Sequence, residues 1–232
     1  MRSARRGGRS DPVSSRPYHP GDDLRLIDRH ASARLSAARG TTELVVRQHF
    51  AQEAARAAVV FDSSPTMQLY SSPWLSKPAA VTVAAALVEA SAWRARCPFE
   101  LRDSLDGLPR GSFAFVVSDF LEPPPESFWL DALERNLDPV PVVVQDPVWE
   151  RSFPEAQGVV LPVAGAEGGR VRPVRLTRRE ASERRRTHEA RFDALVAMLF
   201  GLELEPVVLT SSADANVLDA FLAWAGTRRF AA

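Results

Sequence analysis

The hydrophobic positions of the chain are concentrated in four short runs, each of which ends in polar residues. The runs are rich in valine: ARAAVVF at 55–61, GSFAFVVSDF at 111–120, PVPVVVQDP at 139–147 and EPVVLT at 205–210. Nearly continuous apolar runs of this length are typical of strands that are buried on both faces of a parallel sheet. The pattern therefore predicts four buried strands.

Longer stretches with helical patterning lie between and after these strands. They span residues 78–96, 126–137, 177–201 and 212–225. The third begins with the capping-box residues Thr177 and Glu180. In the second, Leu130, Leu133 and Leu137 are expected to share one face. Strands that alternate with helices predict an α/β fold, an open and mostly parallel sheet with helices on both faces.

The remaining segments suggest three parts. These are a disordered basic tail at 1–16, an N-terminal β arm at 17–56, and the α/β domain at 57–232 with a β-hairpin insertion around 158–176. Within the arm, strands are expected at Ala33–Leu35 and Leu44–Phe50, joined through Gly40. The hairpin is expected because GVVLPV and RVRPVRL flank the turn-forming AGAEGG.

Composition narrows the function classes only a little. The 29 basic and 29 acidic residues cancel, so net charge favours neither nucleic acid nor an acidic substrate. Cys97 is the single cysteine, which indicates a reducing compartment. The basic start leads into polar sequence rather than the apolar core of a signal peptide, and the apolar stretch from Ala79 reaches Glu89 too early to span a membrane. A cytoplasmic protein is expected.

Two predicted strands end in acidic residues that are candidates for a metal site. Asp62 follows the first strand, with Ser64 and Thr66 at alternate positions after it, and Asp119 ends the second strand. The carboxyl ends of parallel strands share one edge of a sheet, where ligands bind. Carboxylate and hydroxyl oxygens suit Mg²⁺. The alternative is that Ser64 and Thr66 cap the next turn and Asp119 caps the segment after it.

Two motifs resemble known families. Residues 62–66, with Asp62, Ser64 and Thr66 at alternate positions, resemble the D-x-S-x-S/T loop of the metal-ion-dependent adhesion site in von Willebrand factor A-like domains. SDF at 118–120 is similar to a later loop of that site. YHPGDDLRLIDRHASARL at 18–35, with LVVRQHFAQE at 44–53, resembles the signature of the family catalogued as domain of unknown function 58. The matching residues are Tyr18, Pro20, Gly21, Asp22, Asp23, Arg25, Ile27, Asp28, Ala33, Arg34, Val46 and Arg47.

The resemblance implies a von Willebrand A-like domain with an N-terminal β arm that accompanies a MoxR-type AAA ATPase. It also implies a Mg²⁺ site at Asp62, Ser64, Thr66 and Asp119, completed by a partner's carboxylate. The domain would be truncated, since only 44 residues separate Met67 from Ser112. The additional Thr of the adhesion site has no clear counterpart, because Thr82 falls inside a predicted helix. A domain that has lost the metal and docks through charged surfaces is therefore the alternative.

Two charged segments have both a structural and a functional interpretation. In the arm, Asp22, Asp23, Arg25, Asp28, Arg34 and Arg47 either pin the arm to the α/β domain or bind a partner. The basic stretch 177–191 either forms a solvated helix face, with Glu180–Arg184 and Arg185–Glu189 pairs, or binds an acidic partner. No aromatic residues interleave with its arginines, which disfavours single-stranded nucleic acid.

The most economical function is a non-enzymatic protein-interaction module. The enzyme alternative is a phosphatase-like hydrolase with Asp62 as nucleophile, as in D-x-D-x-T enzymes. Ser64 stands where those enzymes place a general-acid carboxyl, and a hydroxyl does not exchange a proton near neutral pH as a carboxyl does. Lys77 lies too near the loop in sequence to supply the cation that such enzymes take from a later segment.

Overall fold

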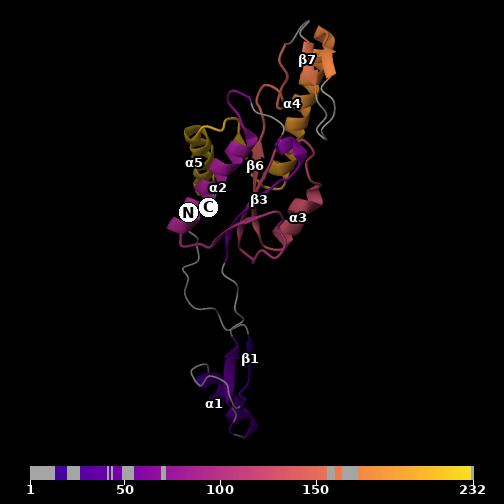
Figure 1. The fold of residues 1–232 in the computed structure, drawn as a ribbon. Coiled ribbons are helices and arrows are strands. Elements are labelled where there is room, and N and C mark those ends of the chain that lie inside the picture. Colours follow the sequence, from indigo (N-terminus) through magenta and orange to yellow (C-terminus); the bar gives the residue numbers. More distant parts are fainter. Residues whose placement is uncertain are drawn as a thin grey trace. The chain divides into compact units, whose positions relative to one another are not determined.

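The computed structural model describes residues 14–19, 27–40, 42, 44–48, 55–68, 72–155, 160–163 and 172–230. The chain folds as two compact units, Met1–Ala54 and Ala55–Ala232 (Figure 1).

The N-terminal unit combines a two-stranded antiparallel ribbon with one helix. β1 (Ser14–Pro17) pairs with β2 (Val45–Gln48), and α1 (Arg29–Arg39) lies between the two strands in the sequence. An isolated bridge joins Ile27 to Val46. β1 begins inside the stretch 1–16, for which disorder was predicted, while residues 1–13 lie outside the described part of the chain.

α1 corrects the prediction of a strand at Ala33–Leu35. Four of its eleven residues are alanine, the residue with the highest helix propensity. Asp28 caps the helix, since its Oδ1 accepts the N–H of Ala31 at 3.0 Å. Gly40 follows the last helical residue at φ +66°, the left-handed conformation that ends many helices. These local signals outweigh the weak alternation of the segment.

Five parallel strands form the sheet of the larger unit, in the order β4-β3-β5-β6-β9. They are β3 (Ala57–Phe61), β4 (Phe99–Arg102), β5 (Phe113–Ser118), β6 (Asp138–Val144) and β9 (Val207–Leu209). The predicted α/β fold with an open parallel sheet is confirmed. Four strands coincide with the four apolar runs, and β4 adds a short edge strand.

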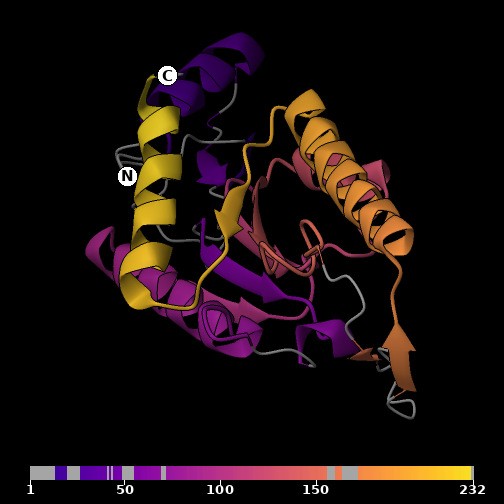
Figure 2. The same ribbon diagram turned by 90° about the horizontal axis from the view of Figure 1, so that it is seen from above.

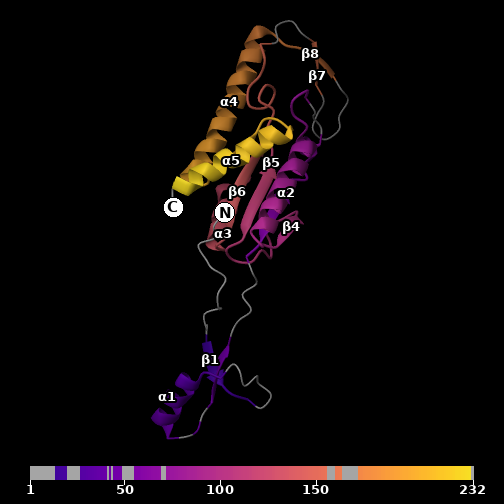
Figure 3. The ribbon, with the colours of Figure 1, turned by 90° about the vertical axis from the view of Figure 1, so that its left-hand side faces the viewer.

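Helices cover both faces of this sheet (Figures 2 and 3). α2 (Lys77–Arg94) and α5 (Asp214–Phe230) pack on one face, and α3 (Glu126–Glu134) and α4 (Arg178–Gly201) pack on the other. Successive strand residues point to opposite faces. Val59 of β3 accordingly belongs to the cluster that includes Trp224, whereas Val60 belongs to the cluster with Trp129 and Leu199.

α3 ends at Glu134, so Leu137, which was expected to share a helix face with Leu130 and Leu133, lies beyond the helix, where it is buried. Trp129 and Ala132 are buried, while Leu130 and Leu133 are 41% and 37% exposed. The described helices include none whose length and apolar character would let it cross a membrane.

A hairpin separates β6 from α4 in the sequence. β7 (Val160–Val163) pairs antiparallel with β8 (Arg172–Arg175), within the range where a hairpin was predicted. Val174 of β8 packs against a small cluster of Phe153, Leu176 and Ala181. α4 then begins at the predicted capping box: Thr177 Oγ1 accepts the Glu180 N–H, and the Glu180 carboxylate accepts the Thr177 N–H at 2.7 Å.

Candidate functional site

The loop after β3 holds the Asp62 carboxylate firmly. Asp62 Oδ1 accepts the N–H of Ser64 at 2.7 Å, and Oδ2 accepts the hydroxyls of Ser64 at 2.9 Å and Ser118 at 2.8 Å. Ser64 Oγ lies 3.0 Å from Thr66 Oγ1. Ser64 precedes a 3₁₀ turn at Pro65–Met67, but its side chain makes no capping hydrogen bond. The Ser64 hydroxyl therefore bonds to Asp62 and lies next to the Thr66 hydroxyl; these side chains, with Ser118, form what we call the Asp62 cluster. The alternative, that the Ser64 side chain caps the following turn, is not what the structure has.

The loop after β5 brings Asp119 to the same edge of the sheet. The Asp62 N–H donates to the Val117 carbonyl at 2.9 Å, which extends the β3–β5 pairing to the strand ends. Ser118 then joins the two loops, because its hydroxyl donates to Asp62 and accepts the Phe120 N–H at 2.9 Å. Asp119 itself is only 2% exposed. The four candidate metal ligands thus gather along one edge, as the parallel-strand argument predicts.

Lys77, the first residue of α2, lies next to the Asp119 carboxylate. Its Nζ donates to Asp119 Oδ2 at 2.7 Å, to Glu150 Oε1 at 2.5 Å and to the Thr66 carbonyl at 3.2 Å. The lysine side chain is completely buried. An ammonium group has three donors, and here all three have acceptors. A buried charge needs such pairing, since an unpaired one is strongly destabilising.

Glu150 reaches Lys77 from the QDPVWE segment after β6. Asp146 organises this segment: its Oδ1 accepts the N–H groups of Val148 and Trp149 at 2.8 and 2.9 Å, and its Oδ2 accepts the Trp74 indole N–H at 3.0 Å. The Asp146 N–H in turn donates to Glu150 Oε2 at 2.8 Å. The turn after β6 is thereby folded so that the Glu150 carboxylate points at the lysine.

Gln145 links the end of β6 to the loop after β5 by a further hydrogen bond. Its Nε2 donates to the Asp119 carbonyl at 2.5 Å, while its Oε1 is buried with no hydrogen-bond partner among the described residues.

Arg191 of α4 supplies a second cation near the same carboxylates. Its Nη2 donates to the Glu150 carbonyl at 2.6 Å. Burial lowers the pKa of its guanidinium, and the charges of Glu150 and Asp119 act in the opposite direction. Two cations from the chain, Lys77 and Arg191, therefore balance the two carboxylates of Asp119 and Glu150.

These contacts fit a magnesium ion poorly. Mg²⁺ requires an octahedron of oxygens, with carboxylates among them. Asp119 Oδ2 is already bonded to the Lys77 ammonium and Oδ1 accepts the Leu121 N–H at 3.1 Å, while both oxygens of Asp62 have donors of their own. A divalent ion on Asp119 would also lie close to the lysine's positive charge.

Two further observations agree with that poor fit. Thr82 is exposed and its hydroxyl donates to the Pro78 carbonyl of its own helix, so it adds no ligand. Among the residues that the structure describes, no three or more His, Cys, Asp or Glu side chains are grouped to hold a metal; a site made of two carboxylates and two hydroxyls does not belong to this class of group.

The charged residues of the arm are only partly within the described chain. Asp22, Asp23 and Arg25 lie outside it. Asp28 caps α1, and its carbonyl accepts the N–H and the hydroxyl of Ser32 at 2.8 and 2.7 Å. Arg34 is exposed on α1, and Arg47 lies in β2 in register with Ser15. Asp28 thus has a role in its own unit, and the pinning network stays a prediction.

The basic first half of α4 holds the segment after Glu150 in place. Arg185 does not form the predicted pair with Glu189: its Nε donates to the Phe153 carbonyl at 2.8 Å and its Nη1 to Glu155 at 3.2 Å. Glu189 instead accepts the Ser152 hydroxyl at 2.7 Å. This face of α4 is therefore a support for the chain that carries Glu150, rather than a wholly solvated surface.

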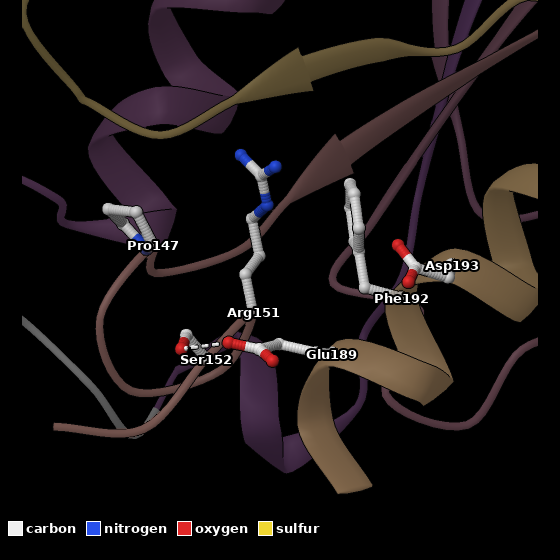
Figure 4. A pocket seen from close by; sticks show the side chains of 6 residues that line it. All are labelled: Pro147, Arg151, Ser152, Glu189, Phe192 and Asp193. Carbon is white, nitrogen blue, oxygen red and sulfur yellow. Dashed lines mark hydrogen bonds between the residues drawn. The ribbon is translucent and has the colours of Figure 1, made fainter. Parts of the chain in front are cut away.

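A polar pocket of about 490 Å³ lies beside this support (Figure 4). It is lined by Pro147, Arg151, Ser152, Glu189, Phe192 and Asp193. The Arg151 guanidinium lies 4.2 Å from the centre of the Phe192 ring. Burial lowers the pKa of Arg151, and Asp193 acts in the opposite direction. Within the described residues the guanidinium forms no hydrogen bond or ion pair, and its buried Nε has no partner.

Residues 14–96 match the model of a family described as "Protein of unknown function DUF58". The match supports the family resemblance over the N-terminal unit and the segment from β3 to α2. This part of the chain contains Asp62, Ser64, Thr66 and Lys77, whereas Asp119 and Glu150 lie beyond it. No curated protein and no solved structure matches the chain.

Proposed function

We propose that the chain is a non-enzymatic, cytoplasmic protein-interaction module that binds its partner at the carboxyl edge of the sheet without a bound metal ion. The observation that carries this proposal is the contact of the Lys77 ammonium with Asp119 at 2.7 Å. A protein cation occupies Asp119, so a partner's carboxylate gains no metal to coordinate there. The family resemblance supports a von Willebrand A-like domain whose partner is a MoxR-type AAA ATPase or a client protein of that ATPase.

Arg151 is the best-placed group to receive the partner. Its guanidinium is held over the Phe192 ring and has no ion pair among the described residues. Arginine binds carboxylates with two parallel hydrogen bonds, and partial burial strengthens such contacts. An acidic side chain of the partner would therefore bind Arg151 in the pocket of Figure 4 in competition with the charge of Asp193.

The phosphatase-like alternative lacks suitable groups in the described part of the chain. A nucleophilic Asp62 would need one oxygen free to attack phosphorus, but both of its oxygens accept hydrogen bonds. Ser64 stands in the general-acid position, and Lys77 is committed to Asp119 and Glu150. The arrangement supports binding better than phosphoryl transfer.

The decisive experiment measures binding of the purified MoxR-type ATPase from the same organism to the immobilised chain, in EDTA and in excess Mg²⁺, without nucleotide. Metal-free docking predicts equal affinity in both buffers. It also predicts a loss of about thirtyfold or more for Arg151→Gln, since removing one partner of a desolvated charge pair costs about 2 kcal/mol or more. Arg94→Gln, an exposed position at the C-terminal end of α2, is the matched control and leaves affinity unchanged.

Other outcomes contradict the proposal in distinct ways. Binding that requires Mg²⁺ and disappears in Asp62→Ala would establish the metal-bridged form of docking. Failure of the ATPase to bind in either buffer would remove it as the partner. Hydrolysis of a generic phosphate ester that is lost in Asp62→Asn would establish an enzyme.

A further inference from the structure

Three neighbouring strands deliver oxygen atoms to one buried point at the carboxyl edge of the sheet. The loop after β3 contributes the Thr66 carbonyl, the loop after β5 contributes Asp119, and the turn after β6 contributes Glu150. The adhesion-type site that the family resemblance implies would place a metal ion among the first two of these loops. Here the group at the convergence point is the Nζ of Lys77, which enters from the N-terminus of α2.

We infer that the Lys77 ammonium is a built-in cation that takes the structural place of a divalent metal ion and locks the three loops together. This inference concerns the chain alone and does not depend on the identity of any docking partner.

The distances favour an ammonium group over magnesium. The three oxygens lie 2.5, 2.7 and 3.2 Å from the nitrogen, which are hydrogen-bond lengths. Magnesium–oxygen bonds are about 2.0–2.1 Å long and require six ligands. The three loops would have to close inward, and add further ligands, before the same point could hold Mg²⁺.

The position of the lysine at a helix N-terminus favours a specific role for its charge. Lys77 is the first residue of α2, whose first turn contains no acidic residue. The N-terminus of a helix carries partial positive charge, so a cation there is unfavourable unless carboxylates surround it. Asp119 and Glu150 provide that compensation, with side-chain exposures of 3% and 13%. Lysine also suits the geometry better than arginine, because its compact ammonium can donate in three directions.

Lys77 is the only lysine in a chain that otherwise uses arginine for every basic side chain. The compact ammonium donates to oxygens from three loops, whereas a guanidinium donates within one plane, which gives a physical reason for this exception. Removal of the side chain should leave two buried carboxylates facing a space without a cation. Such a site would attract a divalent ion, whereas the inference predicts that the wild-type chain binds none.

The experiment compares the wild-type chain with Lys77→Ala and Lys77→Met, by thermal melting and by electron paramagnetic resonance of added Mn²⁺. Both variants are expected to melt about 6–20 °C below wild type, because each leaves buried carboxylates without their cation. Lys77→Ala is expected to bind Mn²⁺ and to melt higher as Mn²⁺ or Mg²⁺ is added, with saturation. Lys77→Met fills the space with an apolar chain and is expected to bind none. The wild-type chain is expected to show neither binding nor a shift.

Adding Asp119→Asn to Lys77→Ala provides the matched control, since it removes a carboxylate and should abolish the gained binding. If Lys77→Ala does not fold in EDTA, refolding in Mn²⁺ is expected to recover it; failure to do so while Lys77→Met folds would contradict the inference. Saturable Mn²⁺ binding by the wild-type chain that disappears in Asp62→Ala would overturn it outright. The inference shares the Lys77–Asp119 contact with the proposed function, but the two are tested separately: docking is measured with the ATPase in EDTA, and the lysine by Mn²⁺ binding to the chain alone.

Discussion

The Ser118 hydroxyl donates to Asp62 Oδ2 over 2.8 Å, so the last residue of β5 holds the carboxylate that follows β3. The same hydroxyl oxygen accepts the N–H of Phe120, whose φ of +48° is unusual for a residue other than glycine. One buried hydroxyl therefore fixes both the Asp62 cluster and the backbone turn that carries Asp119.

Replacement of Ser118 by alanine is expected to lower the free energy of unfolding by about 1–3 kcal/mol, because the Phe120 N–H would be buried without its acceptor. Urea unfolding followed by circular dichroism measures the change. Ser127→Ala, at an exposed position of α3, is the control and should leave stability unchanged within about 0.5 kcal/mol. Equal stability of the two variants would show that Ser118 does not hold the loops.

The start of α4 is expected to weaken in acid. Hydrogen bonds from the Thr177 backbone N–H and hydroxyl lower the pKa of Glu180 below 4.5. Its contribution to stability is therefore present above pH 4.5 and is lost as the pH falls through the lower pKa of the folded state. The melting temperatures of wild type and Glu180→Gln should differ at pH 7 and converge toward pH 3. A difference that stays constant over this range would contradict the assignment.

The Cys97 thiol is expected to be less reactive in the folded chain than in the unfolded chain. Burial raises its pKa above 9.0, and a hydrogen bond with the backbone of Ala57 lowers it by less. The thiolate is the reactive form, so alkylation at pH 8 should be slower for the native chain than for the chain in guanidinium chloride. The native rate should continue to rise above pH 9. Equal rates in the two states at pH 8 would be inconsistent with the burial of this group.

The end of α5 is joined to the start of β6 by a two-pronged ion pair. Arg228 Nη1 and Nη2 donate to the two oxygens of Asp138 at 3.1 and 2.8 Å, and the guanidinium lies 4.9 Å from the centre of the Trp224 ring. The two side chains are about one-third exposed, so solvent screening limits the pair. A double-mutant cycle with Asp138→Ala and Arg228→Ala should give a coupling of about 0.5–1 kcal/mol that falls at high salt.

The coupling energy distinguishes two ways in which Arg228 can stabilise the domain: the ion pair with Asp138 and the contact with the Trp224 ring. If Arg228 acts only through Trp224, the two substitutions will be additive and insensitive to salt.

Apolar run length and turn chemistry were sufficient to predict most of the larger unit. The four runs became strands because each is short, β-branched and bounded by polar residues. The capping box at Thr177 and Glu180 marked the start of α4 correctly, since both of its hydrogen bonds involve residues three apart. Parallel pairing brings the loops after β3 and β5 to one edge, where Asp62 and Asp119 were predicted to lie.

Tertiary contacts decided what local patterns could not. Leu130 and Leu133 are spaced as a helical stripe, but α3 buries Trp129 and Ala132 instead. The larger indole contacts Phe120 and Phe128 at centroid distances of 6.0 and 5.0 Å, and its burial rotates the helix away from the leucines. In the same way Arg185 bonds to the chain at 153–155, which a pattern within α4 cannot reveal.

The contacts of Lys77 were not predicted from the sequence, which placed this residue only in relation to the phosphatase-like alternative. Because α2 starts beside the loop at 62–66, the lysine side chain reaches back to Thr66 and Asp119. Its status as the chain's only lysine was the available signal. Glu150 belongs to the segment QDPVWE at 145–150, which also resembles the family, but neither its contact with Lys77 nor the place of Arg191 followed from the sequence, because they depend on the turn after β6 and the packing of α4.

β7 and β8 pair with each other, and among the described strands neither forms backbone hydrogen bonds with the five-stranded sheet. Because the hairpin is not part of the five-stranded sheet, its length can change during evolution without a change in the order of the five strands. Homologues would then diversify most freely between Phe153 and Leu176, and a fluorescent or affinity tag grafted there should leave the rest of the domain able to fold.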